Sequence, residues 1–297
     1  MGRGAVMDVR EYTADELVAL LPLPDEDANK YTRGTLVLVA GSARYPGAAC
    51  LAAAAGQRMG AGYTEVVCAP DAVPLVRGFR PSLVVRSWEG FQSSDIAPAR
   101  VGKPVAYAVG SGFDAGDAAS ARLVHLVLKH AQVPVLVDGG GLAALASKKG
   151  QRLLKRRFIH GWPTVVTPHG GEAARLARAF ELPEEEPARL SQLLAQAYGT
   201  TVVLKGPDTF VSDGDETVRM GEGTAALAKA GTGDVLAGMV GALLAQGMEP
   251  VDAAVLGATL HARAGAAAAE RLTSISVAAE DVVDAIPCAI ASLAAEA

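Results

Sequence analysis

The residue types and spacing best suited to chemistry lie at residues 230–236 (AGTGDVL), where glycines flank Thr232 and Asp234 follows at the start of an apolar helical pattern. Glycines let backbone N–H groups come close to an anion, and a helix start adds partial positive charge. The stretch therefore predicts a cradle for a phosphate or another oxyanion. Asp234 is interpreted either as a helix cap or as a catalytic base; we favour the base, because a cap needs no flanking glycines.

Two further stretches carry polar residues directly after apolar segments. Residues 205–209 (KGPDT) begin with a lysine that either faces a ligand-binding sheet edge or simply ends a strand at the surface. Residues 167–172 (TPHGGE) place His169 and Glu172 three positions apart at a helix start, where each also has an ordinary structural interpretation. Because the carboxyl ends of parallel strands share one edge of a sheet, we expect these groups to converge on a single site.

Two glycine-containing loops are expected at the same edge, residues 41–47 (GSARYPG) and residues 110–112 (GSG). The full GxGxxG fingerprint and the Walker A sequence are both missing from the chain, so neither a classical dinucleotide-cofactor fold nor a P-loop is indicated. His125, His130 and His261 lie in helical patterns and are interpreted as structural.

Short β-branched segments alternate with Ala- and Leu-rich helical patterns, which is typical of a mostly parallel sheet covered by helices on both faces. The expected strands are 35–40, 64–69, 83–86, 105–109, 134–137, 164–166 and 201–204, and the expected helices between them are 48–59, 117–130, 172–180 and 187–198. A hairpin (209–212 and 217–220) then leads to helices at 232–245, 251–270 and 278–293. We predict one α/β domain over residues 31–297, after a polar lead-in at 1–30 with a short capped helix at 13–21.

Composition excludes several classes of protein. The 297 residues carry a net charge of −5, which argues against nucleic acid as a partner, and no uncharged run reaches the ~20 residues of a membrane span. The first ten residues lack the apolar stretch of a signal peptide. Cys50, Cys68 and Cys288 are widely spaced in apolar surroundings and are predicted to be buried free thiols, so we expect a cytoplasmic protein without membrane contact.

Taken together, the motifs resemble the ADP-dependent NAD(P)H-hydrate dehydratases of the ribokinase-like superfamily, in their stand-alone bacterial form, from about Tyr31 onward. The likeness rests on the order and spacing of KYTRGTLVLVAGSARYPGAA, AVGSG, VVTPHGGE, VVLKGPDT, AGTGDVLAG and AAVLGATLHARAG. It implies a ribokinase-like three-layer sandwich with a mostly parallel central sheet. It also implies a lyase that restores the S-form of hydrated NADH or NADPH to NAD(P)H, consumes ADP and releases AMP and phosphate.

The resemblance implies a role for each motif. Asp234 would take the proton of the hydrate's hydroxyl group, next to an anion hole formed by Gly231, Thr232 and Gly233. A divalent ion, Mg²⁺, is expected from the phosphoryl chemistry, and Glu172 would contact it through water. The implied nucleotide-binding residues are Lys205, Gly206, Pro207, Asp208, Thr209 and Gly233, and the implied hydrate-binding residues are Ala48, Gly112, His169 and Asp234.

The chain departs from the family's usual pattern at four places. Residues 138–141 (DGGG) keep one acid where the family commonly has two, and Asp114 ends a turn that usually ends in glycine. Pro207 removes a backbone donor from the nucleotide loop, and residues 224–227 (TAAL) lack an Asn-Pro pair. These departures bear on substrate fit and rate more than on the fold.

Two other functions stay open at this point. A small-alcohol kinase of the same superfamily, acting on a vitamin precursor, shares the glycine cradle and predicts a preference for ATP. A nucleotide-binding pseudoenzyme predicts ADP binding without turnover. The sequence does not decide between the two hydrates or between ADP and ATP. The Ala-rich helix at 48–59 suits packing against another subunit, so we expect a homo-oligomer, with a tetramer as one candidate.

Overall fold

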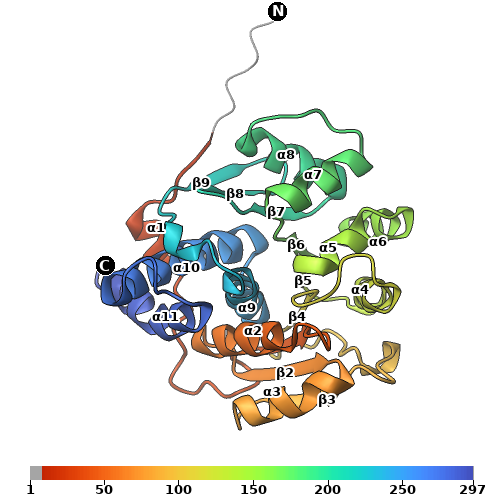
Figure 1. Cartoon of the computed structure of the whole chain (residues 1–297), viewed down its shortest axis with the longest axis horizontal. Coiled ribbons are helices and arrows are strands. Elements are labelled where there is room, and N and C mark those ends of the chain that lie inside the picture. Colours follow the sequence, from red (N-terminus) through yellow and green to blue (C-terminus); the bar gives the residue numbers. More distant parts are fainter. Residues whose placement is uncertain (1–8, 297) are drawn as a thin grey trace, which may run out of the picture.

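The computed structural model describes residues 9–296, which form three layers around a nine-stranded sheet of order β3-β2-β1-β4-β5-β6-β7-β8-β9 (Figure 1). The seven strands from β3 to β7 in this order pair in parallel, whereas β8 and β9 form an antiparallel hairpin at one edge. The predicted mostly parallel α/β sheet is therefore confirmed. The strands are β1 (Thr35–Val39), β2 (Tyr63–Cys68), β3 (Val84–Ser87), β4 (Val105–Val109), β5 (Val135–Val137), β6 (Thr164–Val166), β7 (Thr201–Leu204), β8 (Thr209–Ser212) and β9 (Thr217–Met220).

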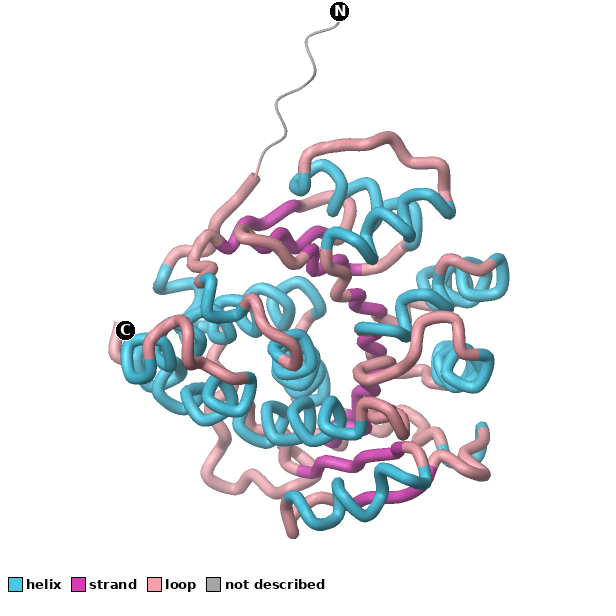
Figure 2. The backbone as a smooth tube through the Cα atoms, viewed as in Figure 1, coloured by secondary structure: helices cyan, strands magenta, loops and turns pink. Residues whose placement is uncertain are grey.

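Successive strand residues point to opposite faces of the sheet, so nearly continuous apolar strands supply two separate cores. In β1, Leu36 and Leu38 face one core while Val37 and Val39 face the other. Helices cover both faces, as the tube in Figure 2 shows. The first core is covered by α2 (Pro46–Arg58), α3 (Val73–Phe79), α9 (Thr232–Ala245), α10 (Pro250–Leu272) and α11 (Ala279–Ala294), and the second by α4 (Ala118–His130), α5 (Leu142–Leu145), α6 (Lys148–Ile159), α7 (Gly170–Ala179) and α8 (Pro187–Tyr198).

The Ala-rich helix α2 packs inside the chain, not at its surface. Its alanines are buried against α9, and a side chain on Gly238 of α9 would overlap the carbonyl oxygen of Ala52. Small residues let the two helix backbones approach closely. The expectation that α2 offers its alanines to another subunit is therefore wrong, because α9 already covers them.

Three helices that the sequence analysis did not predict complete the layers, namely α3, α5 and α6. Six of the twelve residues of α6 are Lys or Arg, and only Gly150, Leu154 and Arg157 are buried, so the apolar pattern is too sparse to reveal the helix. The buried Arg157 donates hydrogen bonds to the carbonyl oxygens of Ala131, Val133 and Pro163 and to the Thr164 hydroxyl, which fastens α6 beneath β6.

The segment before β1 is attached to the hairpin edge of the sheet. Arg10 pairs with β9 through Arg10 N to Thr217 O at 2.9 Å and Arg219 N to Arg10 O at 2.8 Å. The predicted capped helix is present as α1 (Ala14–Ala19), in which Thr13 and Glu16 form a capping box. The first eight residues of the predicted lead-in lie outside the described residues.

The cysteine prediction is right for two of three residues. Cys50 and Cys68 are buried free thiols, but Cys288 is exposed because it lies on the solvent side of α11, so its predicted burial is wrong. Within residues 9–296 no helix is both long and apolar enough to cross a bilayer.

Candidate active site

Polar side chains from four neighbouring strand ends meet around one buried carboxylate. Asp138, directly after β5, is 2% exposed. Its Oδ2 accepts a hydrogen bond from Ser111 Oγ at 3.0 Å, and its Oδ1 accepts from Thr167 Oγ1 at 2.6 Å and from Lys205 Nζ at 3.0 Å. These donors follow β4, β6 and β7, so the convergence of strand ends expected from the sequence is present.

Lys205 is held in the site, not solvated at the surface. The Lys205 side chain is 21% exposed, and its backbone N–H donates to Pro168 O at 2.9 Å, which ties the end of β7 to the TPHGGE loop. Burial lowers the pKa of Lys205, but the negative charges of Asp138 and Glu172 outweigh burial, so the net shift is upward. The ammonium group therefore stays charged and available to an anion.

The predicted glycine cradle forms the N-terminus of α9. Gly231 adopts φ +93°, a left-handed conformation that favours glycine, and a Cβ there would lie 2.7 Å from Leu51 Cδ1. Thr232 donates its hydroxyl to the carbonyl oxygens of Leu227 and Lys229, so the Thr232 side chain fastens the preceding loop. A Cβ on Gly233 would lie 3.3 Å from Lys205 Nζ, which places the lysine beside the cradle.

Asp234 has an environment suited to a base. Burial is the largest influence on the Asp234 carboxyl and the negative charge of Asp138 is the second, and together they raise its pKa to about 7. A Ser111 hydrogen bond and the charge of Lys205 oppose this shift. A carboxyl group with this pKa accepts protons far better at neutral pH than an ordinary aspartate does. The first turn of α9 thus presents a proton acceptor and an anion cradle side by side.

The implied hydrate-binding residues Ala48 and Gly112 touch one another. A Cβ on Gly112 would lie 2.7 Å from Ala48 Cβ and 2.6 Å from the Tyr45 carbonyl oxygen, and Gly112 adopts φ +72°. Only glycine fits where the loop after β4 meets the start of α2. Beside this contact, Asp114 lies 3.8 Å from Arg44, so the departure from the family's turn is part of an exposed ion pair.

His169 and Glu172 share the start of α7, as their spacing predicts. Glu172 Oε2 accepts the His169 backbone N–H at 2.9 Å, and His169 Nδ1 accepts the N–H of Gly171 at 3.1 Å. The His169 side chain is 61% exposed, with Nε2 at 3.6 Å from Glu172 Oε1. The capping contacts leave the His169 imidazole exposed at the sheet edge, whereas the Glu172 side chain is 15% exposed.

The remaining nucleotide-loop residues turn toward the hairpin. Asp208 Oδ2 accepts hydrogen bonds from Arg219 Nε at 3.1 Å and from a second Arg219 nitrogen at 3.0 Å, so Asp208 faces β9 and not Lys205. Thr209 opens β8, Gly206 is exposed, and the Pro207 carbonyl oxygen packs closely on Gly223. The structure thus brings Lys205 and Gly233 together but directs Asp208 elsewhere.

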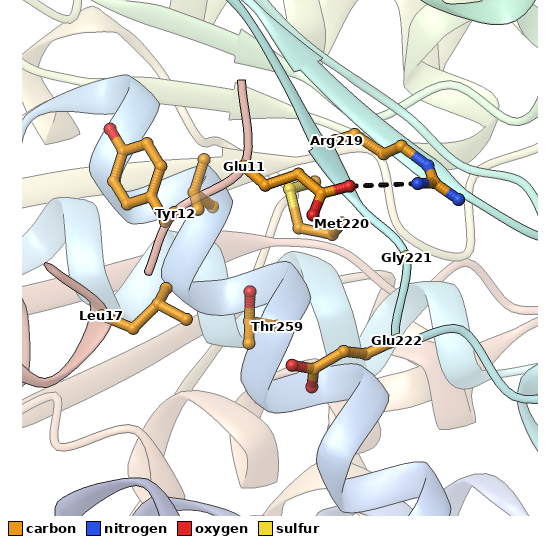
Figure 3. Close-up of a pocket in the computed structure, with 9 residues that line it drawn as sticks. Glu11, Tyr12, Leu17, Arg219, Met220, Gly221, Glu222 and Thr259 are labelled. Carbon is orange, nitrogen blue, oxygen red and sulfur yellow. Dashed lines mark hydrogen bonds and ion pairs between the residues drawn. The ribbon is translucent and has the colours of Figure 1, made fainter. Parts of the chain in front are cut away.

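Arg219 also lines a cavity of about 310 Å³ between the N-terminal segment, β9 and α10 (Figure 3). Glu11 Oε1 accepts from Arg219 at 3.0 Å on one side of this cavity. Its lining residues are Glu11, Tyr12, Leu17, Arg219, Met220, Gly221, Glu222, Val255 and Thr259, none of which was predicted to be a site residue.

Sequence reasoning missed the central role of Asp138, Ser111 and Thr167. In the sequence, Asp138 is distinguished only as a departure from a two-acid run, and Ser111 only as part of a GSG turn. The available signal was their position directly after apolar strands, the same signal that singled out Lys205. Of the histidines interpreted as structural, His125 has a partner, because its Nε2 lies 3.3 Å from Ala144 O. His261 is buried, burial lowers its pKa to about 4, and its Nε2 has no hydrogen-bond partner among the described residues, so its structural interpretation stays a prediction.

Whether a divalent ion fits this site depends on whether protein side chains bind it alone or together with nucleotide phosphates. Within residues 9–296 no three His, Cys, Asp or Glu side chains gather as a metal site. Mg²⁺ usually keeps several waters and takes one or two carboxylates beside phosphate oxygens. Glu172, whose side chain is 15% exposed, suits a water-mediated contact to an ion carried by a nucleotide.

The sequence is similar to proteins of known activity over most of its length. A family model described as NAD(P)H-hydrate dehydratase matches residues 36–288. The chain is 36% identical over 245 residues to an ADP-dependent (S)-NAD(P)H-hydrate dehydratase of Neisseria meningitidis serogroup B, covering 80% of this chain and 78% of that protein. It is 38% identical over 248 residues to a bifunctional NAD(P)H-hydrate repair enzyme of Mycobacterium tuberculosis, covering 83% of this chain and 48% of the relative. The chain spans about half the length of these bifunctional relatives.

Solved structures show the same architecture. An ADP/ATP-dependent NAD(P)H-hydrate dehydratase from Bacillus subtilis, co-crystallised with ATP and Mg²⁺, has a TM-score of 0.79 and 27% identity, covering 97% of this chain and 100% of that one. A ribokinase-like superfamily protein of Enterococcus faecalis V583 also has a TM-score of 0.79, at 24% identity and 96% coverage of both chains. The fold is ribokinase-like, as the sequence resemblance implied.

Proposed function

The chain belongs to the NAD(P)H-hydrate dehydratase family, and we propose that it is an ADP-dependent lyase that restores the S-form of hydrated NADH or NADPH to NAD(P)H. One observation carries the proposal. Asp234, with its pKa raised to about 7, stands in the first turn of α9 directly after a glycine cradle that is flanked by Lys205. A base beside a phosphate cradle is what phosphorylation of a hydroxyl group requires.

The proposed reaction has two steps. The hydroxyl oxygen of the hydrate attacks the β-phosphorus of ADP, AMP leaves, and Asp234 takes the hydroxyl proton. The bond between the ring carbon and the phosphate oxygen then breaks, the neighbouring ring carbon loses a proton to the departing phosphate or to water, and the ring double bond re-forms. Donors that face developing charge in a water-poor site stabilise such transfers strongly, so the N–H groups of Gly231, Thr232 and Gly233 would hold the transferring phosphoryl group.

The strand ends supply the other proposed roles. Lys205 would meet the nucleotide phosphates, and Asp138 would hold the Lys205 ammonium group beside the cradle through the 3.0 Å ion pair. The Lys205–Thr209 loop would carry the rest of the nucleotide, with Asp208 acting through its contact to Arg219. The hydrate would lie against the Ala48–Gly112 contact and the exposed imidazole of His169.

We also propose that Mg²⁺ enters with the nucleotide and contacts Glu172 through water. The bound ion would neutralise phosphate charge during the transfer. The proposed enzyme is cytoplasmic, which its two buried free thiols support, and its catalytic domain spans residues 31–297, which the match of the family to residues 36–288 supports. A homo-oligomer would have to form through surfaces other than the buried alanines of α2.

The proposal is tested by a nucleotide comparison on chemically hydrated NADH. The protein and Mg²⁺ are incubated with the hydrate plus ADP, plus ATP or without nucleotide, and the dihydronicotinamide absorbance is followed. Recovery with ADP, stoichiometric with AMP and phosphate, is expected. Recovery with ATP alone would keep the reaction and overturn the donor. Binding of ADP without recovery in any arm would contradict the proposal and favour the kinase or the pseudoenzyme.

A further inference from the structure

A second cavity lies outside the candidate site, between α6 and the C-terminal ends of α7 and α8. Its volume is about 720 Å³, and three aromatic side chains line it, Phe158 (67% exposed), Phe180 and Tyr198. Three cations of α6 line its rim. We call this cavity the basic groove; it is formed by Lys148, Gln151, Arg152, Lys155, Phe158, Phe180, Gln196, Ala197, Tyr198 and Gly199.

The positive charge of the basic groove is not neutralised within the chain. Lys148, Arg152 and Lys155 follow one another at helical spacings of four and three, so they lie on one face of α6. None of the three forms an ion pair in the part of the chain that the structure describes. The first turn of α6 also has no acid against the positive end of the helix dipole. The groove therefore presents an open cationic rim over apolar side chains.

A segment of matching chemistry lies beside the groove. The loop between α7 and α8, residues 181–187 (ELPEEEP), is here called the acidic loop. Glu184, Glu185 and Glu186 are exposed and form no ion pair among residues 9–296, and Leu182 and Pro183 precede them. Leu182 packs against the core of its own chain, so the loop offers three negative charges after the exposed Pro183, and the groove offers three positive charges beside aromatic side chains.

We propose that the acidic loop of a second copy of this chain occupies the basic groove, so that two copies exchange loop and groove around a two-fold axis. A two-fold interface uses the same patch on both subunits, so the loop and the groove must adjoin. They do: Phe180 lines the groove and Glu184 follows four residues later, at most about 14 Å of chain. The exposed Pro183 would cover the exposed Phe158 ring, while the glutamates meet the cations of α6.

Charge reversal tests this pairing directly. The groove variant is Lys148→Glu/Lys155→Glu, and the loop variant is Glu184→Lys/Glu186→Lys. Sedimentation velocity at about 0.05 M salt should show the wild-type chain in an assembly of at least twice its 30.3 kDa mass, and each variant alone should lose this association. Mixing the two variants should restore it, because each loop then faces a groove of opposite charge. At about 0.5 M salt the wild-type association should weaken.

The controls separate the proposed interface from general charge effects. Arg100→Glu/Arg122→Glu makes the same charge change at exposed positions outside the groove and should leave the assembly intact. Circular dichroism of all variants checks that they fold. A monomeric wild type, variants that associate like the wild type, or a mixture that stays dissociated would each overturn the proposal. If a small anion occupies the groove in place of a second copy, the wild-type chain should be monomeric.

Discussion

Lys205 Nζ lies 3.0 Å from Asp138 Oδ1, although the two residues follow strands β7 and β5, which are separated in the sheet by β6. The ion pair crosses the carboxyl end of β6, where Thr167 donates to the same carboxylate oxygen. Both members of the pair affect Asp234: the charge of Asp138 raises its pKa and the charge of Lys205 lowers it. Substituting either member of the pair should therefore change the pKa of Asp234, in opposite directions, while Asp234 itself is kept.

Replacing Asp138 by Asn should make Asp234 more acidic. Loss of the neighbouring negative charge favours the Asp234 carboxylate, so its pKa should fall below the wild-type value of about 7. The rising acid limb of kcat/KM against pH should move to lower pH, by about one unit or less. A limb that stays in place or moves to higher pH would show that Asp138 does not set the charge around Asp234.

Replacing Lys205 by Met should shift the same limb in the opposite direction. Without the ammonium group, the Asp234 carboxylate loses a favourable charge and its pKa rises. The KM for ADP should also increase by about tenfold or more, because a phosphate contact is lost. Steady-state kinetics across pH measure both effects. An unchanged KM for ADP would remove Lys205 from the nucleotide site.

The burial of Asp234 should cost stability at neutral pH. The pKa of Asp234 is about 7 in the folded chain, against an ordinary value of 3.8 that we take for the unfolded chain. Between pH 3.8 and pH 7 the unfolded chain has lost this proton while the folded chain keeps it, so the free energy of unfolding falls as pH rises. Below pH 3.8 both states are protonated and the cost disappears. Asp234→Asn should therefore be more stable than the wild type at pH 8, by up to about 4 kcal/mol, with the difference shrinking toward pH 4. Urea unfolding at pH 4, 6 and 8 measures this difference, and a gap that is equal at all three values would contradict the pKa assignment.

The cradle should not tolerate a side chain at Gly231. Alanine there would be strained by the φ of +93° whatever the space around it, and its Cβ would meet Leu51 Cδ1 at 2.7 Å and Ala279 Cβ at 3.0 Å, so we expect the backbone of the cradle to move. Displacing one anion-hole donor typically costs about 10²–10³ in kcat, and we expect a loss of this size. Gly78→Ala in α3 is the matched control, because it has no positive φ and nothing within 4 Å of the added carbon. Comparable losses in both variants would point to general destabilisation.

The strands were predictable because each is a short β-branched run, and all nine lie within two residues of their expected limits. Helix α6 was not predictable, because its buried face consists of Gly150, Leu154 and the whole Arg157 side chain, which a periodicity of apolar residues does not reveal. Such a helix forms because it packs against the rest of the fold, and the apolar pattern of its own residues does not predict it.

The candidate site likewise has parts that the sequence predicts and parts that depend on the fold. The cradle at Gly231–Asp234 and the strand-end Lys205 are local patterns, and the structure brings them together. The place of Asp138 depends on which strands are neighbours, since its donors come from β4, β6 and β7. The turn of Asp208 toward Arg219 depends on the β8–β9 hairpin folding back beside the loop. Neither relationship is contained in a motif.

The central claim is that Asp234 is the base beside the phosphate cradle, and Asp234→Asn tests it most directly. Turnover of hydrated NADH with ADP and Mg²⁺ is measured beside the affinity for ADP, with the wild type in parallel. The variant should lose turnover by about 10²-fold or more, the typical contribution of a general base, while it binds ADP as tightly as the wild type or more tightly, since a negative charge near the phosphates is gone. Turnover equal to that of the wild type would contradict the claim.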